Sequence, residues 1–340
     1  MFDNVDNKPG LLSWLLEPVD PGVQYLALKD LVSLSVSDYQ LIDARKTAHE
    51  QGPIAKVLTK MDPEGFWVKP GPGYSPKYHS TVWSIILLAQ LGATVEEDER
   101  IRVACDYLMG HALTKGGYFT YSGAPSGTFD CLQGNMCWAL LELGVDDPRL
   151  DEAFDWMARS QTGEGVANKD DKKAEVRYYA PKCGPNFMCG ANYNLPCAWG
   201  ATKVMLAFSR LPLNKRTGVI QNAIQRGVDF FFSIEPATAT WSQPLDTKPS
   251  RNWWKFGFPV FYNTDLLQVA EAMTALDYGK DPQLAKVITL IRDKQDFMGR
   301  WALEYNYAGK TWNSFGPKNK PNKWVTLRAL RVLNAVGQIE

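Results

Sequence analysis

Residues 183–212 read CGPNFMCGANYNLPCAWGATKVMLAFSRLP. A loop rich in glycine and asparagine carries three cysteines and leads, just past Pro196, into an apolar run that we expect to be helical. The last cysteine, Cys197, stands at the start of that run. A thiol at a helix start lies near the positive end of the helix dipole, which favours the thiolate form that binds metals and attacks electrophiles.

The same kind of helix start recurs along the chain. Six runs begin in an aromatic, polar or cysteine-bearing loop, are apolar nearly all round, and end near a glycine or proline turn. They cover residues 22–34, 78–92, 129–144, 197–212, 261–279 and 323–337. Helices that are apolar on all sides are buried on all sides, so these six are predicted to lie in the interior.

A second, amphipathic kind of helix follows each of the first five buried runs. Two of these helices begin with Asp-Pro, at 147–148 and 281–282, where aspartate is a good N-cap and proline suits the first helical position. The alternation predicts an all-α fold, an (α/α)6 toroid with an inner and an outer ring of helices. We expect one domain over 1–340, with long loop insertions at 162–196 and 234–260.

Composition narrows the class of protein. The chain has 37 basic and 37 acidic residues, and a net charge of zero argues against nucleic acid as the main partner. The first ten residues, MFDNVDNKPG, lack a basic-then-apolar signal segment, and no run approaches the roughly 20 apolar residues of a membrane span. We therefore expect a cytoplasmic protein without a transmembrane segment, and peripheral membrane contact and the oligomeric state stay open. Its six cysteines are expected to be free or metal-bound.

The sequence resembles the α/α-toroid superfamily of squalene and related terpene cyclases and protein prenyltransferase β subunits. The resemblance covers most of the chain and rests on the six-fold helix alternation and on two turns, DPEGFW at 62–67 and FMGRW at 297–301, which look like the Gly/Trp repeat motif of that superfamily. It implies an enzyme that acts on a hydrophobic, isoprenoid-like substrate in a central cavity. The implied reaction is cyclisation, prenyl transfer or a lyase step.

The resemblance does not extend to every catalytic motif. In the zinc-dependent prenyltransferases, inner helices begin with Asp-x-Cys and Tyr-His. Cys197 matches the cysteine, but Leu195 stands where the aspartate would be and Asn263 where the histidine would be. The Asp-x-Asp-Asp motif of squalene–hopene-type cyclases is absent from its expected place. The resemblance therefore predicts the fold more firmly than the chemistry.

Four cysteines lie at or just before neighbouring helix starts. Cys131 begins the third buried run and Cys197 the fourth, while Cys183 and Cys189 lie in the loop that enters the fourth. In a toroid these residues would meet at one end of the cavity, and we predict that they bind zinc, with an iron–sulfur cluster as an alternative. A further alternative is that the thiols act directly, without a metal. Some of them could instead be ordinary buried residues.

Candidate catalytic groups stand at the same helix starts. His79 is a candidate metal ligand or general acid–base. Asp130, beside Cys131, is a candidate proton donor to an alkene, and Asp265, shortly after Tyr262, is a candidate acid or metal ligand. For both carboxylates the alternative is a structural N-cap.

Aromatic residues gather near these helix starts. Such walls stabilise carbocations through cation–π contact, or simply shape an apolar pocket. The residues expected to contact a hydrophobic small-molecule substrate are Trp83, Trp199, Trp253, Trp254, Phe261 and Trp324. The remaining alternative is a non-catalytic toroid that binds a peptide or a lipid on its open face.

Overall fold

The computed structural model describes residues 10–244 and 247–337, and the all-α prediction is confirmed. Within these residues the only paired strands are two short ones, β1 (Met188–Cys189) and β2 (Leu195–Pro196), which run antiparallel with Cys189 opposite Leu195. No helix in the same two ranges is both long and apolar enough to cross a bilayer. Residues 1–9, for which the sequence predicts no signal segment, lie outside the described part of the chain.

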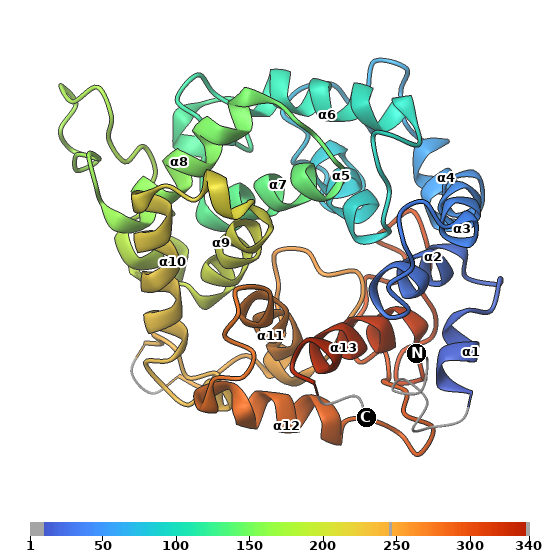
Figure 1. Cartoon of the computed structure of the whole chain (residues 1–340). Coiled ribbons are helices and arrows are strands. Elements are labelled where there is room, and N and C mark those ends of the chain that lie inside the picture. The colour runs from blue at the N-terminus through green and yellow to red at the C-terminus, as the bar shows by residue number, and fades with distance from the viewer. Residues whose placement is uncertain (1–9, 245–246, 338–340) are drawn as a thin grey trace.

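Six helices correspond to the six predicted buried runs. They are α2 (Pro21–Asp30), α5 (Thr81–Gln90), α7 (Asp130–Glu142), α9 (Ala198–Arg210), α11 (Leu266–Ala275) and α13 (Lys323–Ala335). They contact one another in the order α5, α7, α9, α11, α13 and α2, and Figure 1 shows them around the centre of the molecule. Nearly every residue of α5 is buried, as expected for a helix that is apolar on all sides.

The amphipathic helices lie outside these six (Figure 1). They are α3 (Tyr39–Glu50) and α4 (Gly52–Leu58) on α2, α6 (Glu99–Ala112) on α5, α8 (Pro148–Thr162) on α7, α10 (Gly218–Phe231) on α8 and α9, and α12 (Ala285–Asp293) on α11. A short helix, α1 (Leu11–Leu15), contacts α2. The short 3₁₀ turns are η1 (Pro125–Gly127), η2 (Pro185–Phe187), η3 (Gly190–Asn192), η4 (Leu213–Lys215), η5 (Pro236–Thr238), η6 (Arg251–Trp254) and η7 (Pro282–Leu284).

Both Asp-Pro helix starts are confirmed. The Asp147 side chain accepts a hydrogen bond from the backbone N–H of Arg149 at the start of α8. Asp281 accepts one from Gln283 and opens η7, which leads directly into α12. Local capping chemistry therefore sets where these outer helices begin.

The fifth inner helix begins later than the sequence pattern predicts. The apolar run starts at residue 261, but α11 starts at Leu266 because Asp265 is its N-cap and accepts a hydrogen bond from the backbone N–H of Gln268 at 2.8 Å. Phe261 and Tyr262 consequently lie in the preceding loop rather than on the helix.

The contact between α7 and α9 is the most extensive of any two helices. Two glycines make it close. A Cβ added to Gly134 of α7 would lie 2.4 Å from the carbonyl carbon of Lys203, and one added to Gly200 of α9 would lie 3.3 Å from the Cβ of Asp130. The absence of side chains at both positions brings the starts of the two helices together, and with them Asp130 and Cys197.

Replacing Gly134 by alanine should lower the free energy of unfolding by about 1–3 kcal/mol, because the added methyl group overlaps the α9 backbone. Gly110 of α6 is the matched control, since a Cβ there would meet no atom within 4 Å. Gly110→Ala should be neutral or stabilising by up to about 1 kcal/mol. Denaturant unfolding measures both variants, and equal effects would contradict the close-packing role of Gly134.

Candidate active site

A cavity of about 600 Å³ lies beside the starts of α7 and α9. Three predicted metal ligands, Cys131, Cys189 and Cys197, line it, and we call it the cysteine pocket. Much of the remaining wall is aromatic and consists of Tyr74, Tyr121, Phe129, Trp199, Trp241, Trp253 and Tyr262. A concave site of this size with a mainly aromatic wall suits an apolar small molecule.

Asp130, the first residue of α7, contributes a buried carboxyl group to this pocket; only 5% of the residue is exposed. Its Oδ1 accepts a hydrogen bond of 3.0 Å from Nε2 of Gln161, while Oδ2 is buried with no hydrogen-bond partner among the described residues. Burial, and secondarily the nearby Cys189, raise the pKa of Asp130 well above its ordinary value. The group is therefore favoured as a neutral carboxylic acid.

Cys189 and Cys197 are neighbours but differ in protonation. The Cys197 thiol donates a hydrogen bond to Cys189, and this bond is the largest influence lowering the pKa of Cys189, to about 6. The backbone N–H groups of Ala191 and Asn192 and the ammonium group of Lys182 add to the effect. The same hydrogen bond, together with burial, raises the pKa of Cys197. Cys189 is thus the thiolate and Cys197 the thiol.

The other two predicted cysteines occupy different surroundings. Cys131 lines the pocket, and burial followed by the nearby Asp130 raises its pKa to about 12. Cys183 is buried in a separate small apolar cluster with Tyr178 and Ala180, where its thiol donates to the carbonyl oxygen of Ala180 at 3.5 Å. It is not among the residues that line the pocket. The structure therefore brings three of the four cysteines together.

A zinc site requires several converging donors. Across residues 10–244 and 247–337, no three His, Cys, Asp or Glu side chains come together in an arrangement that could hold a metal ion. Raised pKa values at Cys131 and Cys197 also favour neutral thiols, whereas metal ligation requires thiolates. The donor set does not fit the predicted zinc or iron–sulfur group, so we derive no step through a metal, and metal binding stays a prediction.

Two of the predicted catalytic residues lie apart from the cysteine pocket. The ring of His79 packs edge-on against Trp312 with ring centroids 4.6 Å apart. Asp265 is the N-cap of α11 and forms a buried ion pair with Arg328 at 3.0 Å. Its carboxylate is also hydrogen-bonded by the backbone N–H groups of Gly257 and Gln268. The geometry agrees with the alternative interpretation of Asp265 as a structural cap.

Three aromatic residues singled out in the sequence do line the pocket. Trp199 and Trp253 face one another with ring centroids 6.4 Å apart, and Trp199 also lies 6.3 Å from the ring of Tyr262. The ammonium group of Lys77 lies 4.5 Å from the Tyr262 ring centre, close enough for a cation–π contact. These residues form an apolar wall with a positive charge above one ring.

The other four predicted substrate contacts are not lining residues of this pocket. Trp83 and Phe261 are fully buried and pack edge-to-face against each other. Trp254 donates a hydrogen bond to the carbonyl oxygen of Ala237, and Trp324 stacks on Phe258 with ring centroids 4.5 Å apart.

Sequence reasoning missed the residue that positions Asp130. Gln161 ends α8, donates to Asp130, and accepts a hydrogen bond of 2.7 Å from the backbone N–H of Phe187. A signal was present, because the outer helices that begin with Asp-Pro both end in glutamine, at 161 and 295. Trp241, also missed, lies in the long loop 234–260, where no periodic pattern indicates which side chains turn inward.

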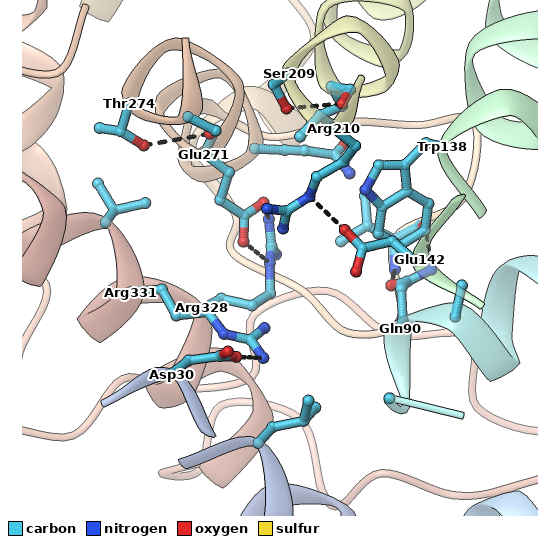
Figure 2. Close-up of a pocket in the computed structure, with 18 of the residues that line it drawn as sticks. Asp30, Gln90, Trp138, Glu142, Ser209, Arg210, Glu271, Thr274, Arg328 and Arg331 are labelled. Carbon is cyan, nitrogen blue, oxygen red and sulfur yellow. Dashed lines mark hydrogen bonds and ion pairs between the residues drawn. The ribbon is translucent and has the colours of Figure 1, made fainter. Parts of the chain in front are cut away.

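A second cavity of about 410 Å³ lies at the opposite ends of the inner helices and is lined by residues of all six. Figure 2 shows three arginine–carboxylate pairs around it, Arg328 with Glu271, Arg331 with Asp30, and Arg210 with Glu142. Each pair joins two different inner helices. Because these charges are matched to one another, we assign this cavity a structural role. The cysteine pocket, with its unpartnered acid oxygen, is the candidate active site.

Comparison with known proteins adds little to this geometry. No family model matches the chain, and no curated protein matches it. Among solved structures, the chain is similar to one described as the crystal structure of a protein from Actinoplanes, at 12% identity and a TM-score of 0.36, with 87% of this chain and 99% of that chain covered. A TM-score this low does not define a shared fold.

Replacing Arg328 by alanine should lower the free energy of unfolding by about 3–5 kcal/mol, because Asp265 and Glu271 would lose the cation that balances them in the interior. Arg102→Ala is the control, since its ion pair with Glu99 is exposed, and it should cost less than about 1 kcal/mol. Denaturant unfolding at neutral pH distinguishes the two. A cost for Arg328→Ala as small as that of the control would contradict the structural role of the ion pairs.

The raised pKa of Asp130 should make stability depend on pH. In the unfolded chain this carboxyl group ionises around its model value of 3.8, whereas the folded protein keeps the proton to higher pH. The unfolded state then binds fewer protons, so stability falls as pH rises above about 4, until the folded group also ionises. Asp130→Asn removes this effect and should lose less stability than wild type over that range. Parallel unfolding-versus-pH curves would show that the carboxyl group is not buried and neutral.

Proposed function

We propose that this chain is an enzyme with an (α/α)6 toroid fold that binds a hydrophobic, isoprenoid-like molecule in the cysteine pocket and rearranges it by proton transfer. The observation that carries the proposal is the buried carboxyl group of Asp130, which has an unpartnered oxygen and lies on the wall of an aromatic cavity. The contact order of the six inner helices supports the toroid. The resemblance to terpene cyclases and prenyltransferases supports the substrate class.

In the proposed first step, Asp130 donates its proton to a carbon–carbon double bond of the substrate. A C–H bond forms, the O–H bond of Asp130 breaks, and a carbocation and a carboxylate result. The raised pKa keeps the acid protonated between turnovers. The hydrogen bond from Gln161 stabilises the carboxylate, and the rings of Trp199 and Trp253 stabilise the cation.

In the second step, the Cys189 thiolate accepts a proton from a carbon next to the cationic centre. The electrons of that C–H bond form a new double bond, so the product is an isomer of the substrate. It contains a new ring if a second double bond attacks the cation before the proton leaves. Proton exchange with solvent then returns Asp130 to the acid and Cys189 to the thiolate. Two groups with opposite protonation states at the same pH are what this sequence requires.

Turnover of isoprenoid alcohols and hydrocarbons in D₂O tests the proposal. The product should carry deuterium on carbon, because the proton of Asp130 exchanges with solvent. Asp130→Asn should lower the rate by about 100-fold or more while leaving substrate binding, followed by tryptophan fluorescence, nearly unchanged. The matched control is Asp151→Asn, since that carboxylate is exposed; it should retain full activity.

Three outcomes would contradict the proposal. Full activity of Asp130→Asn would remove the acid from the mechanism. Loss of turnover on addition of a chelator would favour the zinc prediction over metal-free proton transfer. Binding without turnover for every compound tested would favour a binding toroid.

A further inference from the structure

Cys189 and Cys197 lie on one face of the short β1–β2 pair. Cys189 is opposite Leu195, and Cys197 follows two residues later in extended conformation, as the N-cap of α9. Side chains two residues apart on a strand share a face, so Cys197 is the diagonal neighbour of Cys189. Diagonal neighbours are typically separated by about 7–8 Å, and these two thiols are close enough to share a hydrogen bond. A disulfide requires Cα atoms within about 7 Å, so only a small backbone shift separates the thiol pair from a bond.

The segment between the two cysteines has few contacts that oppose such a shift. Each strand contains only two residues. Tyr193 is 75% exposed and Met188 is 40% exposed, so neither side chain anchors the segment in the core. Tyr193 and Asn194 also have positive φ angles of 58° and 60°, a conformation that residues other than glycine rarely adopt. A short, exposed and strained connection of this kind can move without disturbing the inner helices.

Cys189 is also the cysteine best placed to meet an oxidant. It is half-buried and lines the pocket, whereas Cys105 and Cys137 are buried within α6 and α7. Three hydrogen-bond donors, the Cys197 thiol and the backbone N–H groups of Ala191 and Asn192, point at its sulfur and stabilise the thiolate. Oxidant-sensitive cysteines combine thiolate character, access and an adjacent thiol that resolves the oxidised sulfur.

We propose that a hydroperoxide oxidises Cys189 and that Cys197 then forms a reversible disulfide with it. The Cys189 thiolate attacks the terminal peroxide oxygen, the O–O bond breaks, and the released oxyanion takes a proton from solvent to leave as water or an alcohol. The peroxide is reduced, and the sulfur is oxidised to a sulfenic acid. The Cys197 thiol attacks that sulfur, the S–S bond forms and water leaves. A dithiol reductant restores both thiols and is itself oxidised to a disulfide.

The disulfide would remove the thiolate from the cysteine pocket and so stop any reaction that needs it. The inference does not depend on the proposed isomerisation, because its test measures the covalent state of two cysteines. An inactive enzyme would therefore leave the redox result unaffected, and a negative redox result would leave the proton-transfer mechanism standing.

The test treats the full-length protein with hydrogen peroxide, alkylates the remaining thiols and maps the peptides by mass spectrometry. Cleavage at Tyr193, between the two cysteines, makes a disulfide visible as a linked peptide pair. We expect the Cys189–Cys197 pair to appear first and to disappear on treatment with dithiothreitol. Cys105 and Cys137 should stay alkylatable at the same dose. Oxidation of Cys189 no faster than of these buried cysteines would overturn the inference.

Single variants assign the roles. Cys197→Ser should leave a sulfenic acid on Cys189, which dimedone labels, while Cys189→Ser should yield neither the label nor a linked pair. Cys183→Ser is the matched control, since that thiol lies outside the pocket, and it should form the disulfide as wild type does. A linked pair that joins Cys189 to Cys131 or Cys183 instead would show that Cys197 is not the resolving thiol.

Discussion

The close approach of α7 and α9 is the constraint on which the candidate site depends. Gly134 lets the backbone of α7 rest against α9 at Lys203, and Gly200 lets the start of α9 rest against Asp130. Side chains at these two positions would hold the helices apart. Because they are absent, the acid at one helix start and Cys197 at the other share one wall. The loops that enter both helices then add Cys189 and the aromatic residues.

The site separates its groups by environment rather than by residue type. Asp130 is an acid that keeps its proton because water and hydrogen-bond donors reach only one of its oxygens. Cys189 is a thiol that loses its proton because several donors converge on it. The same cavity therefore holds a proton donor and a proton acceptor at one pH. This arrangement is how proteins place opposite acid–base roles side by side.

The sequence pattern was sufficient for the class of fold and for the positions of the inner helices, because apolar residues on every side of a helix indicate burial directly. It was also sufficient to place Cys131, Cys189 and Cys197 in one pocket, because each stands at or just before a helix start. It could not predict that Asp265 is neutralised by Arg328, 63 residues further along the chain. Nor could it predict that Gln161 holds Asp130. Both depend on tertiary contacts that leave no local periodicity.

The arginine–carboxylate pairs have a consequence for the order of events during synthesis. Arg328 and Arg331 belong to α13, yet they balance acidic groups on α11 and α2. A nascent chain that still lacks α13 carries Asp265, Glu271 and Asp30 without these cations, and burying them unpaired is strongly unfavourable. The earlier helices can reach their final packing only after translation has passed Arg331, so chains that stop short would stay open and available to chaperones or proteases.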